Sequence, residues 1–206
     1  MDCKGRMFSM NKFYHVIYSI LWVLAKVFYP WKAKGAENLP KSGGVVLCGN
    51  HTSFIDPILV LLSAGKNRQL HIVAKAELFK IPVLNWILKN IEVISVKRGK
   101  SDIAAFKECL RVLKNQGSLL IFPEGTRVKG GEEIDGRPGA VVMAARSGVP
   151  IVPIYIEPKK RMFRKSDVIF GEPYMLEFAG RKPTPEESHQ LTEDLMIRIR
   201  ALGENT

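Results

Sequence analysis

The sequence predicts a single α/β domain in which helices flank a mixed, mostly parallel sheet, preceded by an N-terminal helix at a membrane interface. Three observations support this fold class. Short apolar runs of strand type alternate with amphipathic helical segments after residue 40. A chain of 206 residues is long enough for one well-buried domain. The most apolar stretch, residues 13–31, precedes this alternation.

The N-terminal stretch predicts a helix that lies in the membrane interface rather than crossing it. As a helix, residues 13–31 would be about 28 Å long, close to the thickness of a hydrocarbon core. Its polar side chains fall within an arc of about 80°, and these are Lys12, His15, Ser19, Trp22 and Lys26. A narrow polar stripe bordered by aromatic residues is typical of interfacial helices. A buried core helix is one alternative, and a signal peptide is another, although no small-residue cleavage site follows. We therefore expect a membrane-associating segment at 1–34 and the α/β domain at 35–206.

The elements of the α/β domain follow from local signals. A turn at 40–44 opens the domain, and Asp56-Pro57 is a helix-start signal because Asp caps free N–H groups and Pro suits the first helical turn. Gly117 ends a later helix, and the glycine-rich residues 128–136 form a connection. The predicted strands are 45–49, 70–75, 91–97, 118–122, 151–156 and 167–171. The predicted helices are 57–64, 82–89, 101–115, 138–147 and 185–202.

Charge and cysteine content restrict the partners and the compartment. The chain has 31 Lys and Arg residues against 20 Asp and Glu, a net charge of +11, which favours an anionic partner such as nucleic acid or an acidic membrane surface. No nucleic-acid-binding motif is visible, so we expect no nucleic-acid partner. Cys3, Cys48 and Cys109 are odd in number and show no Cys-x-x-Cys spacing. We therefore expect neither a disulfide framework nor a metal site, and a reducing compartment.

Polar groups gather just beyond hydrophobic strands, which is where sites usually lie on such sheets. Four segments share this property: 50–56, 96–98, 122–127 and 148–153. In the first, the Asp56 carboxylate can fold back onto one ring nitrogen of His51 and leave the other nitrogen free as a base. The alternative is that Asp56 only caps a helix and His51 is only a polar loop residue.

These four segments, in this order, resemble the motifs of the glycerolipid acyltransferases, and most of all those of the lysophosphatidic acid acyltransferases. The resemblance covers residues 35–157 and includes Val73–Pro82. A His-x4-Asp spacing alone is unspecific, but its combination with Phe-Pro-Glu-Gly-Thr-Arg at 122–127 is specific. The chain departs from the pattern in the second segment, where the family usually has Gly and this sequence has Glu92. That departure concerns the acceptor site more than the reaction.

The resemblance implies transfer of an acyl chain from a thioester, acyl-CoA or acyl carrier protein, to the free sn-2 hydroxyl of lysophosphatidic acid, which gives phosphatidic acid. His51 would take the hydroxyl proton, and Asp56 would orient His51. No cofactor is expected besides the donor. Another lysophospholipid or glycerol 3-phosphate is the alternative acceptor.

The resemblance also implies an acceptor site and a location. Arg127 and Arg98 are candidates to bind the acceptor phosphate, because a guanidinium group can hold phosphate with two hydrogen bonds. Lys97 could assist them, and Glu124, Gly125 and Thr126 are expected at the acceptor by resemblance. An enzyme with lipid substrates is expected on the cytoplasmic face of the cell membrane, bound to an anionic surface.

Overall fold

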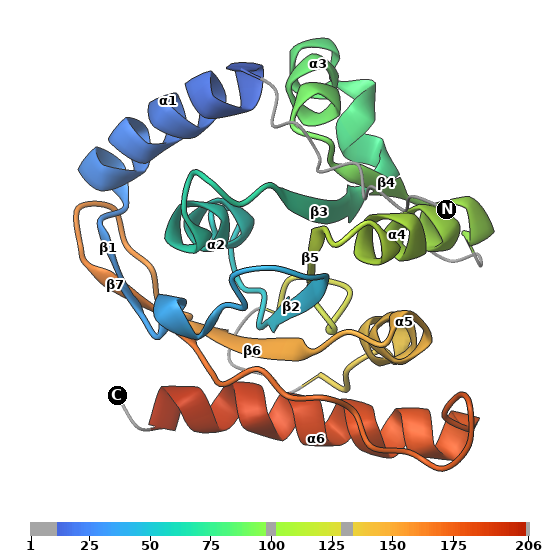
Figure 1. Ribbon diagram of the computed structural model, residues 1–206. Coiled ribbons are helices and arrows are strands. Elements are labelled where there is room, and N and C mark those ends of the chain that lie inside the picture. Colours follow the sequence, from blue (N-terminus) through green and yellow to red (C-terminus); the bar gives the residue numbers. More distant parts are fainter. Residues whose placement is uncertain (1–11, 98–101, 129–133, 205–206) are drawn as a thin grey trace.

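The computed structural model describes residues 12–97, 102–128 and 134–204, and these residues form one sheet with helices on both faces (Figure 1). Its seven strands follow the order β1-β7-β6-β2-β5-β3-β4. Their bounds are β1 Trp31–Lys34, β2 Val45–Gly49, β3 Leu70–Lys75, β4 Ile94–Val96, β5 Ser118–Ile121, β6 Ile151–Ile156 and β7 Ser166–Phe170. Within the described chain, β6 and β7 are antiparallel and the other neighbouring strands are parallel. The predicted mixed, mostly parallel sheet is therefore confirmed.

Strands β2, β5 and β6 form the centre of the sheet and are almost entirely buried. Their Val-, Leu- and Ile-rich runs are typical of parallel strands that are covered on both faces. On one face pack α1 (Lys12–Phe28), α2 (Asp56–Ala64) and α3 (Pro82–Asn90). On the other face pack α4 (Ile103–Lys114), α5 (Gly139–Ser147) and α6 (Pro185–Glu204), as Figure 1 shows. The described residues also form two short 3-10 helices, at Ala36–Asn38 and Ala76–Lys80.

Strand β4 is shorter than the predicted strand 91–97. The chain turns at Glu92, whose φ of 56° lies in the left-handed region, so the extended backbone begins only at Ile94. Glycine adopts this conformation without steric cost, whereas a residue with a Cβ does so under strain. Glu92 thus occupies a backbone position that suits the glycine expected there from the sequence resemblance.

Strand β1 was not predicted from the sequence. It pairs in parallel with β7 at the edge of the sheet, in the register Trp31 to Ser166 through Lys34 to Ile169. Lys34 Nζ also contacts Asp167 Oδ2 at 2.6 Å. The four residues Trp-Lys-Ala-Lys are too short and too polar to give a strand signal. The sheet therefore begins inside the segment 1–34 that was assigned to the N-terminal helix, and that helix ends at Phe28.

Helix α1 packs one face on the domain and exposes another apolar face. Tyr14 and Tyr18 are buried, and their hydroxyl groups donate to the carbonyl oxygens of Arg68 at 2.9 Å and Leu62 at 2.8 Å. Ile17 and Leu21 also pack against the core, so these two apolar side chains of the predicted interfacial helix are not available to lipid. The opposite side exposes Val16, Ile20, Val23, Leu24, Val27 and Phe28. In the described ranges, no helix is long and apolar enough to cross a membrane.

A pair of glycine substitutions tests whether β1 is an integral part of the domain. Gly35, just after β1, has a φ of 69°, and a Cβ there would lie 2.2 Å from the carbonyl oxygen of Phe170 in β7. Gly35→Ala should lower the free energy of unfolding by about 3 kcal/mol or more, because left-handed strain adds to a backbone clash. Urea denaturation in mild detergent measures this.

The matched control is Gly43→Ala. Gly43 has a φ of 89°, but a Cβ at this position would meet nothing within 4 Å. The substitution should cost about 1 kcal/mol, from backbone strain alone. Equal destabilisation by the two substitutions would contradict the close packing of Gly35 against β7.

Candidate active site

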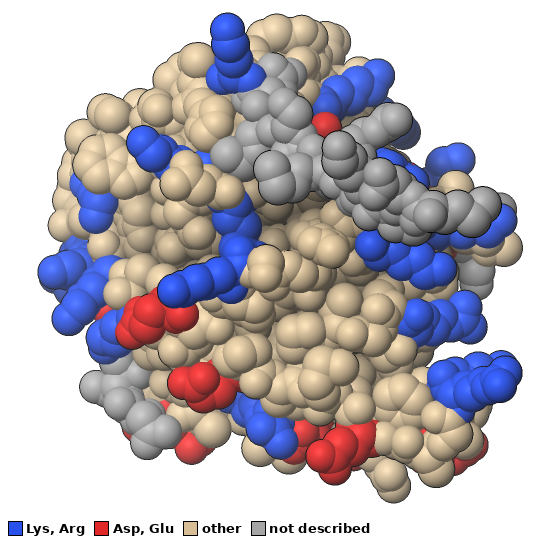
Figure 2. Space-filling view, in the orientation of Figure 1, with Lys and Arg blue, Asp and Glu red and all other residues tan. Residues whose placement is uncertain are grey.

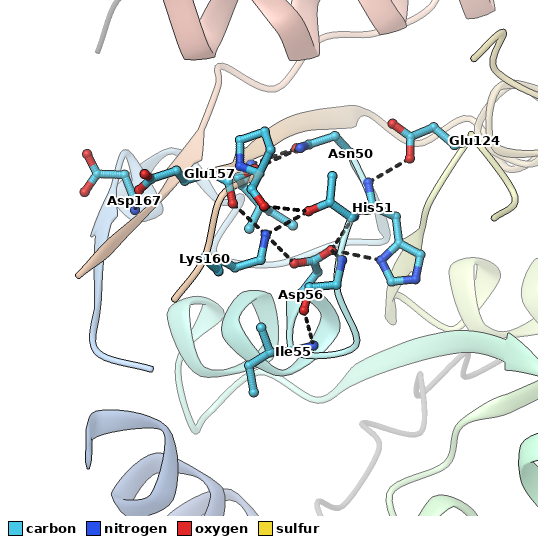
Figure 3. A network of polar contacts seen from close by, with 12 residues as sticks. Asn50, His51, Ile55, Asp56, Glu124, Glu157, Lys160 and Asp167 are labelled. Carbon is cyan, nitrogen blue, oxygen red and sulfur yellow. Dashed lines mark hydrogen bonds and ion pairs between the residues drawn. The ribbon is translucent and has the colours of Figure 1, made fainter. Parts of the chain in front are cut away.

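The predicted pairing of His51 with Asp56 is confirmed. His51 lies in the loop after β2, and Asp56 begins α2; His51 Nδ1 and Asp56 Oδ2 are 3.0 Å apart (Figure 3). Asp56 is fully buried, while the His51 side chain remains 16% exposed. An ionised carboxylate only accepts hydrogen bonds, so Nδ1 carries the proton. The Nε2 atom is thus left as a proton acceptor on a ring that is partly open to solvent.

The Asp56 carboxylate organises the loop as well as the ring. Oδ2 also accepts hydrogen bonds from the backbone N–H groups of Thr52 and Ser53, each at 2.7 Å. On the other side, Lys160 Nζ contacts Oδ1 at 2.7 Å. Asp56 was predicted to cap α2, but its side chain serves the preceding loop instead, and Pro57 occupies the first turn as expected.

The pKa of Asp56 reflects these contacts. Burial by itself would raise the pKa of this carboxyl group, because the charged form loses its hydration. The hydrogen bond with His51 and the nearby Lys160 ammonium outweigh burial, and the pKa lies below its usual value. Asp56 is therefore a carboxylate, the state that orients His51 and can stabilise an imidazolium ion.

Two neighbouring strands fix the loop that carries His51. The Asn50 side chain makes a pair of hydrogen bonds with the backbone of Ile156 at the end of β6, donating to its carbonyl oxygen and accepting from its N–H, both at 2.8 Å. From the β5 side, Phe122 stacks on the His51 ring with centroids 4.2 Å apart. Val128 N–H donates to the His51 carbonyl oxygen at 2.8 Å. The position of the ring is thus held from β6 and from β5.

Glu124 lies beside this loop rather than in open solvent. It is buried, and its carboxylate accepts a hydrogen bond from the His51 backbone N–H at 2.8 Å. Burial raises the pKa of Glu124 to about 7, and the charge of Asp56 adds to that rise. Next to it, Gly125 has a φ of 65° and donates to the Phe122 carbonyl oxygen at 3.0 Å, closing a tight turn. The left-handed conformation explains the glycine at this position.

The predicted acceptor-binding residues divide into a near set and a distant one. The Arg127 guanidinium lies over the Phe54 ring, 3.5 Å from its centroid, so Arg127 contacts the loop that holds the His51–Asp56 pair. Thr126 is exposed in the same turn. Lys97 is exposed beyond β4, three strands away from β2 in the sheet, which corresponds to about 14 Å. Arg98 lies outside the described residues.

Sequence reasoning missed two residues of this site. The sequence pattern gives Asn50, in the segment 50–56, no role, and it does not single out Lys160. No local signal distinguishes Lys160 from Lys159 or Arg161, because only the fold brings its side chain to Asp56. Among the described residues, no group of three or more His, Cys, Asp and Glu side chains could hold a metal ion.

Fold and site together define an α/β protein with a histidine–carboxylate pair at the carboxyl edge of a parallel sheet, an arrangement suited to general-base catalysis. The chain belongs to the Acyltransferase family, whose model matches residues 31–157.

Named relatives agree with this assignment. The chain is 38% identical over 149 residues to the chloroplastic 1-acyl-sn-glycerol-3-phosphate acyltransferase of Arabidopsis thaliana, a match that covers 70% of this chain and 41% of that protein. It is 33% identical over 177 residues to the 1-acyl-sn-glycerol-3-phosphate acyltransferase of Bacillus subtilis, covering 83% of this chain and 87% of that one. The chain spans about half the length of several curated relatives that it matches.

A solved structure shares the fold. The crystal structure of the 1-acyl-sn-glycerophosphate (LPA) acyltransferase from Thermotoga maritima superposes with a TM-score of 0.67 at 27% sequence identity. The superposition covers 94% of this chain and 76% of that chain. The similarity therefore extends beyond residues 31–157 to nearly the whole α/β architecture.

Proposed function

We propose that the protein transfers an acyl chain from an acyl thioester to the sn-2 hydroxyl of lysophosphatidic acid, giving phosphatidic acid. The observation that carries the proposal is the His51–Asp56 pair, with Nδ1 bound to the carboxylate and Nε2 available. The names of the relatives support the choice of acceptor. Acyl-CoA or acyl carrier protein supplies the thioester, and no cofactor is needed, because the thioester already carries the activated acyl group.

The proposed reaction proceeds by direct attack. His51 Nε2 takes the proton of the acceptor hydroxyl group while the hydroxyl oxygen forms a bond to the thioester carbonyl carbon. The tetrahedral intermediate then collapses, the carbon–sulfur bond breaks, and the proton passes from His51 to the leaving thiolate. Asp56 fixes the ring and stabilises the imidazolium ion between these steps. Base catalysis of this kind contributes roughly 10²–10⁴-fold to the rate.

The acceptor phosphate is assigned to Arg127. Its guanidinium group lies over the Phe54 ring, beside the loop of His51, and such a group can donate two hydrogen bonds to phosphate oxygens. Thr126 adds a hydroxyl group, and Glu124, with a pKa near neutral, can bond a glycerol hydroxyl in either protonation state. Lys97, beyond the end of β4, and Arg98 remain proposed contacts because the sequence resemblance implies them. Another lysophospholipid or glycerol 3-phosphate is the alternative acceptor.

The proposed location is an anionic membrane surface on the cytoplasmic side. The exposed apolar face of α1 is followed by exposed apolar side chains at α3, namely Val83 and Trp86 on the helix and Ile81 just before it. Phe13 of α1 meets Trp86 edge to face, with ring centroids 4.7 Å apart. Figure 2 shows Asp and Glu mostly on the half of this view nearer α6, while Lys and Arg predominate among the charged residues of the half nearer α1 and α3. Apolar side chains ringed by cationic ones are typical of an interfacial surface.

The catalytic assignment predicts a loss of turnover in His51→Ala. Removing the base should lower acceptor-dependent thiol release by at least about 10²-fold without unfolding the domain, because the loop loses a ring and the core loses no volume. Thiol release from acyl-CoA and from acyl carrier protein should be followed with lysophosphatidic acid, with glycerol 3-phosphate and without acceptor.

The control is His189→Ala, at an exposed position on α6. It should retain wild-type turnover. A folded His51→Ala protein with near wild-type turnover would refute the mechanism. If the wild-type protein preferred glycerol 3-phosphate to lysophosphatidic acid, glycerol 3-phosphate would be the acceptor instead.

The phosphate assignment predicts a selective effect of Arg127→Lys. The acceptor's KM should rise because the two-pronged contact is lost while the charge remains, and thioester hydrolysis should change little. Monoacylglycerol, which lacks the phosphate, should show no such rise. If transfer and hydrolysis fell together, Arg127 would be structural. Arg181→Lys, at an exposed position, is the matched control.

The location predicts weaker vesicle binding when Val16, Ile20 and Val23 are replaced by Ser. These side chains lie on the exposed face of α1, and each contributes about 1.5–3 kcal/mol when fully buried in an apolar phase. Sedimentation with anionic vesicles should show the loss, whereas high salt should release little wild-type protein. The control replaces Met175 and Ile197, which are equally exposed elsewhere, by Ser. Unchanged sedimentation of the α1 variant would contradict the assignment.

A further inference from the structure

Lys160 is buried within a basic, exposed stretch of the chain. Its side chain is 2% exposed, whereas Lys159 and Arg161 on either side are exposed. The Lys160 ammonium meets three acceptors: Asp56 Oδ1 at 2.7 Å, Thr52 Oγ1 at 3.0 Å and the Glu157 carbonyl oxygen at 2.5 Å (Figure 3). An ammonium group has three protons, so this arrangement uses all of them. Such a fit fixes the ammonium in one place.

The contact satisfies the far side of the Asp56 carboxylate. Oδ2 is served by His51 and by two backbone N–H groups, but no hydrogen-bond donor other than the Lys160 ammonium reaches Oδ1 from the described parts of the chain. A buried carboxylate oxygen without a partner is costly, and so is a buried ammonium. Each charge therefore holds the other in place. Because Lys160 follows β6 and Asp56 follows β2, the ion pair also joins two loops at the carboxyl edge of the sheet.

We propose that Lys160 is a positioning residue of the active site, which fixes the Asp56 carboxylate and balances its negative charge beside the His51 ring. This inference rests on the proposed function, and Lys160 lies three residues beyond the segment 31–157 that the family model matches.

The charges around His51 give the physical reason. Asp56 favours the imidazolium form of the ring, and Glu124, which accepts from the His51 backbone N–H, adds negative charge once it ionises. Two positive charges act in the opposite direction and disfavour a further positive charge on the ring. One is Arg127, which lies over the Phe54 ring, and the other is Lys160, which contacts Asp56. Of these two cations, Lys160 is the one in direct contact with the carboxylate. Without it, no cation in direct contact would offset the charge of Asp56 beside His51.

Neutral substitutions at Lys160 test this role. Lys160→Gln removes the charge but keeps a donor for Asp56 Oδ1, and Lys160→Met removes both; if Lys160→Met fails to fold, Lys160→Gln carries the test. The titration midpoint of the His51 ring is measured by NMR in micelles without substrate and assigned with His51→Gln. Both variants should raise this midpoint by about one pH unit, because a nearby positive charge no longer opposes protonation. The acidic limb of kcat/KM should move to higher pH by the same amount.

Two further variants separate charge from structure. Lys160→Arg keeps the charge and should restore the midpoint, but kcat should stay several-fold low, because a planar guanidinium does not fit three acceptors around one ammonium. Lys159→Met removes the neighbouring exposed charge and should leave both the midpoint and the pH profile as in the wild type.

The outcomes distinguish this inference from the proposed function. A wild-type midpoint in Lys160→Gln, or an equal shift in Lys159→Met, would overturn the role of Lys160. The NMR titration does not depend on turnover. If the wild-type protein transferred no acyl group while the midpoint still moved, the charge coupling of Lys160 to His51 would stand and the proposed function would fail.

Discussion

The arrangement of the site depends on one buried negative charge, the carboxylate of Asp56. A carboxylate with no solvent exposure is stable only when its oxygens are all partnered. His51, two backbone N–H groups and Lys160 meet that requirement, and in doing so they fix the loop, the tautomer of the ring and the approach of the segment after β6. The same contacts that make the charge tolerable therefore produce an oriented base. Stability and reactivity here have a common cause.

The parallel sheet supplies the partners because it brings distant loops to one edge. β2 lies between β5 and β6, so the loop after β2 is bordered by the turn that carries Glu124 and by the segment that carries Lys160. Phe122 and Val128 hold the loop from one side, and Ile156, through Asn50, holds it from the other. Loops that are anchored on both sides lose little further freedom when substrates bind, which favours a pre-organised site.

The N-terminal region packs one face on the domain and leaves another face exposed. Tyr14 and Tyr18 attach α1 to the end of α2, and β1 then completes the edge of the sheet. The remaining face of α1 is apolar and exposed, and it joins the exposed face of α3 at Phe13 and Trp86. A helix that is fixed to the domain on one side can hold the domain against a bilayer on the other. A membrane surface there would bring lipid substrates to a protein whose orientation is already set.

The sequence by itself determined the α/β class, most strands and helices, and the His51–Asp56 pairing. Hydrophobic periodicity, helix-start signals and a spacing of five residues are local properties. It did not reveal β1, whose four residues become a strand only beside β7. It also did not distinguish Lys160 from the lysine before it, or show why Asn50 precedes His51. Those contacts join residues more than a hundred positions apart, such as Asn50 and Ile156. Only the order of the strands in the folded sheet decides which of many similar polar side chains reaches the buried charge.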